Sequence, residues 1–282
     1  MAKLKLNAPE DSLQPFIEDG SEFPVGAIID FPKLDTLPVE FSIQNLSVKN
    51  QIADGNDDFC ASAAGTVAKE VQENVELFYP YVFAAAKHES GKDPDAFGLS
   101  IKDVGKALCE WGVPELKDVS ESVLNLEPAA RRRFENYPEA LREKAKIHKG
   151  QTYFFVYGPH DPYDNARCVQ EAFRLKGLKM PLVFGVKFGW DLEQFVLAGT
   201  PEGFGHAMTD FGWYENGIKV LNSAGVEAGK DGFHSIPRET FNYFAGKYGI
   251  LVITDMPRNE AEKAVRVLNS NWLIKLFYRF MR

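Results

Sequence analysis

The sequence is poor in cysteine, carries no excess of basic residues and has no long apolar run. Its three cysteines cannot build a disulfide framework in 282 residues, and no pair has C-x-x-C spacing, so we expect free thiols, a reducing compartment, no metal and no cofactor. The net charge of −8 argues against nucleic acid as the main partner, because binding phosphates needs a basic field. We also expect no secretion signal and no transmembrane helix, because the apolar segments that either would need are missing.

The composition is that of a globular protein, and the pattern of its residues changes along the chain. Apolar residues make up 45% and charged residues 26%, which is typical of a chain with a full core. Residues 1–36, rich in Pro, Asp and Glu, predict an N-terminal surface arm, and residues 37–150 predict a helical half. Residues 151–255 predict a mainly antiparallel β half, and residues 256–282 a C-terminal amphipathic helix. The whole is an α+β arrangement.

Several residues in the first half mark the expected ends of helices. Asp57 and Asp58 are suitable N-cap residues for a long helix. Ser100 is a suitable cap and Gly112 a stop for a second helix, and Pro138 must break or restart a third, charge-rich one. The apolar face of the first helix is predicted to carry Ala64, Val67, Val71, Val75 and Phe78.

The second half alternates β-branched and aromatic runs with turns. Five runs predict strands, and "NARCVQEAFRLKG" predicts a helix closed by Gly177; the strand runs are "TYFFVYG", "MPLVFGVKF", "HAMTDFGWY", "GIKVLNS" and "GILVITD". "YENG" predicts a hairpin turn that pairs Tyr214 with Gly217. In that register Asn222 faces Thr209, so a contact between Asn222 and the nearby His206 requires a bulge or a different register.

Only one of the five histidines has the setting of a functional residue. His206 opens a strand directly after a glycine, in "GFGHAMTDFGWY". The others occur in polar or loop-like surroundings and are predicted to be exposed; they are His88, His148, His160 and His234. Asp210 shares a strand face with His206 and could tune its pKa, but we favour a solvated carboxylate.

Cys60, at the start of the first helix, is a candidate nucleophile. A cysteine attacks a carbonyl as thiolate, and the positive end of the helix dipole favours that charge by about 0.3–2 kcal/mol. An imidazole such as His206 can take the thiol proton, and an amide such as Asn222 can orient the ring. Gln51 is a candidate donor to a developing oxyanion. The plain alternative for Cys60 is a buried core thiol, which is also what we expect of Cys109 and Cys168.

These motifs resemble those of the papain-like cysteine peptidases. The likeness covers residues 37–245 and rests on "LPVEFSIQNLSVKNQ", the helix-starting Cys60, "GHAM" and "LNSAG", in the family's order Gln, Cys, His, Asn. The stretch "SGKDPDAFGLSIKDVGKALCEWGVPE" is more similar to bacterial and phage members. The resemblance implies a helical half and an antiparallel β-barrel-like half with the active site in the cleft between them. It also implies a Cys60–His206–Asn222 triad with Gln51 at the oxyanion.

The sequence departs from the family pattern around each part of this set. The loop between Gln51 and Cys60 is longer than usual. Ala61 and Ala224 stand where the family has tryptophans, and the second of those tryptophans shields the bond between histidine and asparagine from water. The acidic residues 57 and 58 directly before Cys60 oppose a thiolate.

The predicted function is hydrolysis of peptide bonds in a peptide or protein substrate by a thiol peptidase. One alternative is a catalytically silent papain-like module with a binding or structural role, for instance in a virus particle; another is a cysteine isopeptidase or acyl hydrolase. The expected location is cytoplasmic or virion-associated. The basic, aromatic tail, residues 256–282, is predicted to dock on an anionic membrane or a protein, or else to pack on its own domain.

Overall fold

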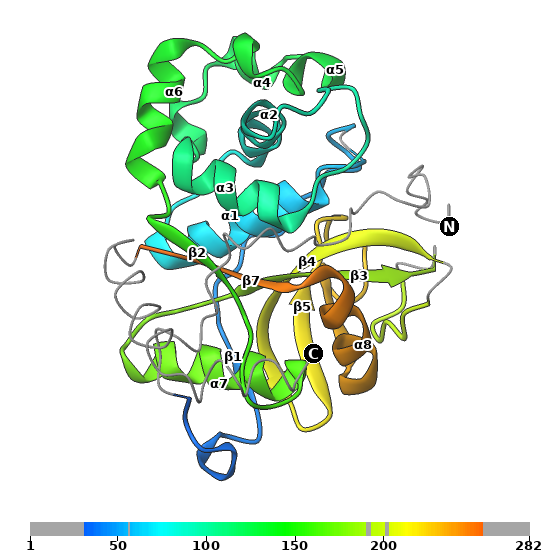
Figure 1. Ribbon diagram of the computed structural model, residues 1–282. Coiled ribbons are helices and arrows are strands. Elements are labelled where there is room, and N and C mark those ends of the chain that lie inside the picture. The colour runs from blue at the N-terminus through cyan, green and yellow to red at the C-terminus, as the bar shows by residue number, and fades with distance from the viewer. Residues whose placement is uncertain (1–30, 56, 190–192, 201–202, 256–282) are drawn as a thin grey trace.

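The computed structural model describes residues 31–55, 57–189, 193–200 and 203–255. Most of the predicted arm and the whole predicted C-terminal helix therefore lie outside the described residues. The described chain has the predicted α+β fold, with a helical half above an antiparallel sheet in the view of Figure 1. None of the helices in this part of the chain has the length and apolar character that spanning a membrane requires.

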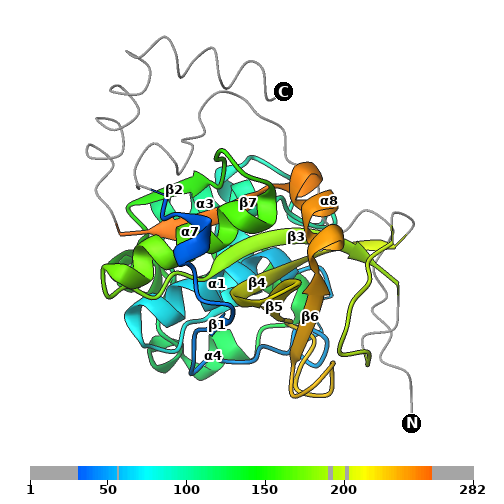
Figure 2. The same cartoon turned by 90° about the horizontal axis from the view of Figure 1, so that it is seen from below.

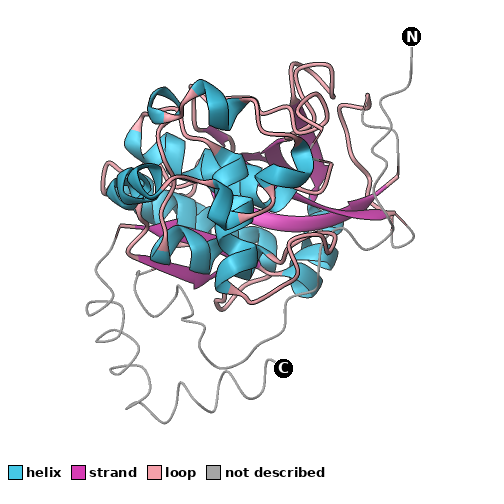
Figure 3. Ribbon diagram, turned by 90° about the horizontal axis from the view of Figure 1, so that it is seen from above, coloured by secondary structure: helices cyan, strands magenta, loops and turns pink. Residues whose placement is uncertain are grey.

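The helical half begins with the longest helix on that side, α1 (Cys60–Glu73), which runs between the other helices and the sheet (Figure 1). It contacts α2 and α3 on one side and β3, β4 and β7 on the other. The further helices are α2 (Tyr79–Glu89), α3 (Ile101–Glu110), α4 (Glu121–Leu124), α5 (Pro128–Arg131) and α6 (Glu139–Ala145). Figure 3, which looks at the molecule from above, shows helices in front of the strands.

The predicted boundaries of the second and third predicted helices, which are α3 and α6 in the structure, are confirmed. Ser100 caps α3 in a full capping box with Asp103, and Gly112 follows the helix with φ +70°. Pro138 is the N-cap of α6 and so restarts the charge-rich segment. Short 3-10 turns connect these helices at Leu116–Asp118, Phe134–Asn136 and Lys146–His148, and another, Leu34–Thr36, precedes the first strand.

The first helix differs from the prediction at both ends. Its N-cap is Phe59, and neither Asp57 nor Asp58 caps it. The helix ends at Glu73 because Asn74 adopts a left-handed conformation, with φ 56°. Of the predicted apolar face, Val75 and Phe78 therefore lie beyond the helix, whereas Ala64, Val67 and Val71 are buried within it.

The strands form one antiparallel sheet in the order β2-β7-β3-β4-β5-β6, with β1 paired to β4. Their bounds are β1 (Phe41–Ser42), β2 (Thr152–Phe155), β3 (Leu182–Phe188), β4 (Phe204–Tyr214), β5 (Gly217–Leu221), β6 (Phe233–Pro237) and β7 (Ile250–Thr254). Two helices, α7 (Pro162–Leu175) and α8 (Arg238–Tyr248), lie on the side of the strands away from α2 to α6 (Figures 1 and 2). The strand β6 was not among the predicted ones.

The hairpin of β4 and β5 contains the feature that positions the candidate site. Its turn pairs Tyr214 with Gly217 as predicted, but a bulge at Phe211 shifts the register by one residue, so Asp210 pairs with Val220. A one-residue shift moves every following side chain to the opposite face of the strand. The bulge also needs a glycine beside it, because a Cβ on Gly212 would meet the carbonyl oxygen of Phe41 in β1 at 2.3 Å.

Candidate active site

Cys60 is the first residue of α1, and the residue before it anchors this end of the helix. The Phe59 ring stacks on Phe83 with 3.8 Å between centroids, and the Arg132 guanidinium lies over both rings at 5.5 and 5.2 Å. Phe59 and Phe83 are both fully buried. The start of the helix is therefore held by aromatic packing, and the cysteine has little freedom to move away from the sheet.

The acid next to this anchor is paired rather than solvated. The Asp58 carboxylate is buried and receives Arg132 Nη2 at 2.5 Å and Nη1 at 3.0 Å. It also accepts the backbone N–H of Gly98 at 3.0 Å. Arg132 thus offsets much of the charge that the sequence places before Cys60. The Asp57 carboxyl has its pKa raised, first by burial and then by the charge of Asp58.

Cys60 is nearly closed to solvent, at 2% exposure of the residue. Burial raises the pKa of its thiol to about 12, and the charge of Asp58 adds to the rise. Hydrogen bonds from the backbone of Ala207, Ala61 and Cys60 itself oppose it. In this state the cysteine is a neutral thiol, with its sulfur beside the strand residue that follows His206.

The structure brings His206 and Asn222 into direct contact. His206 Nε2 lies 2.8 Å from Asn222 Oδ1, and both residues are 1% exposed. The contact depends on the bulge in β4, which places Asn222 on the same face of the sheet as His206. Since an amide oxygen only accepts, the Nε2 atom must carry the proton, and the lone pair is on Nδ1. Burial lowers the pKa of His206 to about 4, against the effect of the bond to Asn222.

Two histidines that were predicted to be exposed are buried. His234, in β6, is 1% exposed and contacts Asn222: its Nε2 lies 3.2 Å from Asn222 Nδ2. His148 is buried between two glutamates: its Nδ1 contacts the Glu73 carboxylate, and its Nε2 lies 3.4 Å from Glu115 Oε1. The strand that carries His234 was missed in "GFHSIP" because its alternation extends over only a few residues. His88 and His160 are exposed, as predicted.

Gln51 connects the loop before Cys60 to Ser223, the residue after Asn222. Its side chain is fully buried. Its Nε2 donates to the carbonyl of Asp57 at 3.1 Å, its Oε1 accepts the Ser223 hydroxyl at 3.2 Å, and its backbone N–H donates to the Ser223 carbonyl at 2.9 Å. The long loop folds back onto this amide. Gln51 therefore links a residue shortly before Cys60 to the residue after Asn222, and its amide carries a second N–H besides the one given to Asp57.

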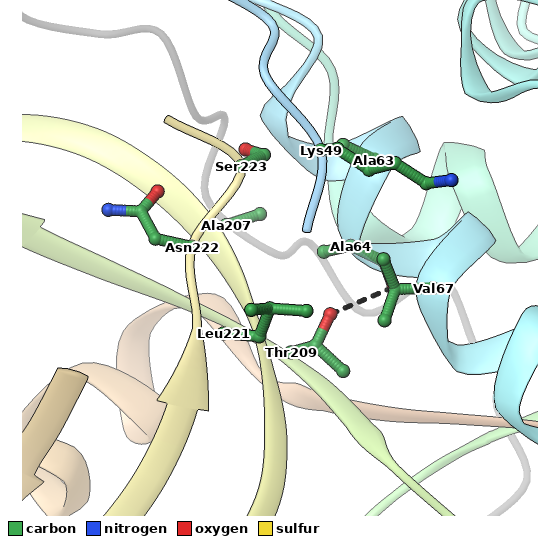
Figure 4. Close-up of a pocket in the computed structure, with 9 residues that line it drawn as sticks. All are labelled: Lys49, Ala63, Ala64, Val67, Ala207, Thr209, Leu221, Asn222 and Ser223. Carbon is green, nitrogen blue, oxygen red and sulfur yellow. Dashed lines mark hydrogen bonds between the residues drawn. The ribbon is translucent and has the colours of Figure 1, made fainter. Parts of the chain in front are cut away.

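A small cavity, with room for about one water molecule, lies between α1 and the hairpin of β4 and β5 (Figure 4). Thr209 points into it and donates to the carbonyl of Ala64 in α1 at 3.1 Å, which links the two halves. The Asn222 side chain points away from α1 in the same view. The amide of Asn222 is therefore directed toward the His206 and His234 face of the sheet.

Asp210 is buried, which corrects the prediction of a solvated carboxylate. Its Oδ1 accepts the backbone N–H of Gly212 at 2.9 Å across the bulge. Burial raises the pKa of this carboxyl to about 8. Neither Cys109 nor Cys168 is part of a disulfide bond, and burial raises the pKa of Cys168 to about 11. Among the described residues, no group of three metal-binding side chains comes together.

Comparison with known proteins finds a likeness in structure. No protein-family model and no curated protein matches the sequence. The chain is similar to xylellain, a cysteine protease from Xylella fastidiosa, with a TM-score of 0.70 and 17% identity over 90% of this chain and 98% of that one. It is similar to procathepsin B of Trypanosoma congolense, with a TM-score of 0.57 and 13% identity over 86% of each chain. It is also similar to bromelain of Ananas comosus, solved with the inhibitor E64, with a TM-score of 0.53 and 17% identity over 77% of this chain and 99% of that one.

These likenesses show that the chain has the α+β fold of the papain-like cysteine proteases, as its motifs predicted. At these identities they concern the fold alone. The predicted nearness to bacterial and phage members and the predicted segment boundaries stay predictions.

Proposed function

We propose that the protein is a papain-like cysteine peptidase in which Cys60 is the nucleophile, His206 the base and Asn222 the residue that orients the base. His206 Nδ1 takes the thiol proton as the sulfur attacks the peptide carbonyl. The same proton goes to the leaving amine when the C–N bond breaks, which leaves a thioester on Cys60. Water, deprotonated by His206, then attacks the thioester and releases the acid, returning the proton to sulfur.

One observation supports this proposal more than the others: the 2.8 Å bond from His206 Nε2–H to Asn222 Oδ1. It selects the tautomer with its lone pair on Nδ1, which is what a base needs. The backbone N–H groups at the start of α1 are suitably placed to stabilise an oxyanion next to the sulfur, and Gln51 offers a second N–H from the loop before it.

The burial of the site favours a second candidate, a catalytically silent scaffold. Cys60 and His206 are both nearly inaccessible, with pKa values of about 12 and about 4, so the described state holds a neutral pair. A peptidase requires substrate binding to open the site and hydrate or replace this environment. A scaffold requires no opening.

Labelling with a peptidyl epoxide at pH 7, followed by peptide mapping, tests the proposal. If exposure alone determined the labelling rate, Cys109 would react faster than Cys60, because Cys109 is partly exposed whereas Cys60 is buried. The peptidase proposal predicts the reverse order, and it predicts that His206→Ala lowers Cys60 labelling by about 10³-fold. The exposed His160→Ala is the matched control and should leave labelling unchanged.

Preferential labelling of Cys109, or Cys60 labelling that persists in His206→Ala, would contradict the proposal and favour the scaffold. Where Cys60 does react selectively, digestion of a peptide library distinguishes a peptidase from an isopeptidase, because only a peptidase cleaves linear peptides.

A further inference from the structure

His234, in β6, is a further polar side chain on the face of the sheet that carries His206 and Asn222. Its strand, β6, pairs with β5 so that His234 faces Val220, and Asn222, the residue directly after β5, lies two residues beyond Val220 on the same face. Beyond β5, His206 lies on this face of β4. His206 in β4, Asn222 at the end of β5 and His234 in β6 therefore lie in a row across neighbouring strands, and each is 1% exposed.

The hydrogen bonds in this row determine where every proton lies. His234 Nδ1 is 2.8 Å from the carbonyl oxygen of Gln194, which can only accept, so Nδ1 carries the proton of a neutral ring. The Nε2 of His234 is then an acceptor, and it faces Asn222 Nδ2, a donor, at 3.2 Å. Asn222 Oδ1 consequently points at His206, where it accepts the Nε2–H.

The row would not tolerate a reversed Asn222 amide. Reversal would place the amide N–H groups against the Nε2–H of His206 and would set two lone pairs against each other at His234. His206 could satisfy a reversed amide only by moving its proton to Nδ1, which would remove the lone pair that accepts the thiol proton. The orientation of Asn222 therefore depends on what it meets on its far side.

We propose that His234 is a positioning residue for the reaction: by accepting from Asn222 Nδ2 it holds the amide in the orientation that keeps the His206 lone pair on Nδ1. This inference rests on the proposed function. It also assigns a role to a side chain that contacts the Asn222 amide in a sequence that has Ala224 in place of the shielding tryptophan. The turn before β6 leaves room for the ring: a Cβ on Gly229 would meet His234 Cε1 at 2.6 Å.

Two substitutions separate this role from simple packing. His234→Phe keeps a ring of similar volume but removes both hydrogen bonds. His234→Gln keeps an acceptor and a donor at nearly the spacing of the two ring nitrogens, so it can bond both Asn222 Nδ2 and the Gln194 carbonyl. We expect kcat to fall about 10²-fold in His234→Phe with KM unchanged, and to recover most of that loss in His234→Gln. Equal kcat in both variants and the wild-type protein would overturn the proposal.

A spectroscopic test does not require activity. Nitrogen-15 NMR of the histidine side chains in the full chain should show His206 with its proton on Nε2 and His234 with its proton on Nδ1. In His234→Phe, the His206 signal should become a mixture of tautomers. If the protein proves inactive but shows these tautomers, the function proposal fails and the positioning role of the ring stands. A His234 proton on Nε2 in the wild-type protein, or an unchanged His206 tautomer in His234→Phe, would refute the positioning role.

Discussion

The helical side of the candidate site is held by charge and aromatic rings, whereas the strand side is held by neutral hydrogen bonds. On the helical side, the Asp58–Arg132 ion pair and the stacked Phe59 ring fix the start of α1. On the strand side, two uncharged imidazoles hold one amide between them. A charge pair locks a position but costs desolvation, whereas a neutral row also determines which nitrogen carries a proton.

The largest effect is expected from breaking the charged anchor. Arg132→Met leaves the buried Asp58 carboxylate without its partner and should lower the free energy of unfolding by about 3–5 kcal/mol in urea denaturation. Arg133→Met is the matched control, because its ion pair with Asp95 is largely exposed and should contribute less than about 1 kcal/mol. Equal losses in the two variants would show that burial does not distinguish the pairs.

The pH dependence of Cys60 alkylation tests how strongly solvent is excluded from the helical side of the site. Because the pKa of Cys60 is raised to about 12, alkylation by iodoacetamide should rise with pH without a plateau below pH 9, by about 100-fold from pH 7 to pH 9. The measurement is the rate of adduct formation at Cys60 by mass spectrometry. A plateau near neutral pH would mean that Cys60 is already solvated or paired with a charged His206 before substrate arrives.

A smaller effect is expected at Asp210, which lies at the bulge on the strand side. Its pKa is raised to about 8 from 3.8, so the folded state holds the proton more tightly than the unfolded state. This contribution to stability is complete below about pH 4 and is lost as the pH rises through 8. Asp210→Asn cannot ionise, so its stability relative to the wild-type protein should improve by on the order of 2 kcal/mol between pH 6.5 and pH 9.

Thermal unfolding at the two pH values measures this difference. The exposed Asp95→Asn serves as the control. A pH-independent effect of Asp210→Asn would mean that the carboxylate ionises freely in the folded protein.

The smallest effect concerns the contact between the two sides. Thr209→Val keeps the shape of the side chain but removes its bond to the Ala64 carbonyl, and should cost about 1 kcal/mol of unfolding free energy. Urea denaturation with an unchanged m-value checks this. If the loss approaches that of Arg132→Met, the two halves depend on each other more than the separate anchors imply.

Much of the local structure could be predicted because it depends on neighbours in the chain. The Ser100 cap and the turn after Tyr214 follow from nearby residues, and both are confirmed. The predicted N-cap of α1 is wrong because the Asp58 carboxylate is hydrogen-bonded to Arg132, which is distant in sequence. His234 was missed for a similar reason, since its burial depends on strand pairing between β5 and β6.

The sequence by itself determined the chemical inventory and its order: Gln51, Cys60, His206 and Asn222, with small residues in α1 and a tight turn between two strands. Only the tertiary structure decided which of these side chains meet. The bulge at Phe211 placed Asn222 on the face of His206, because one extra residue reverses the alternation of a strand. Burial then decided the protonation of the site, since the desolvation of a thiol, an imidazole or a carboxyl depends on atoms contributed by the whole fold.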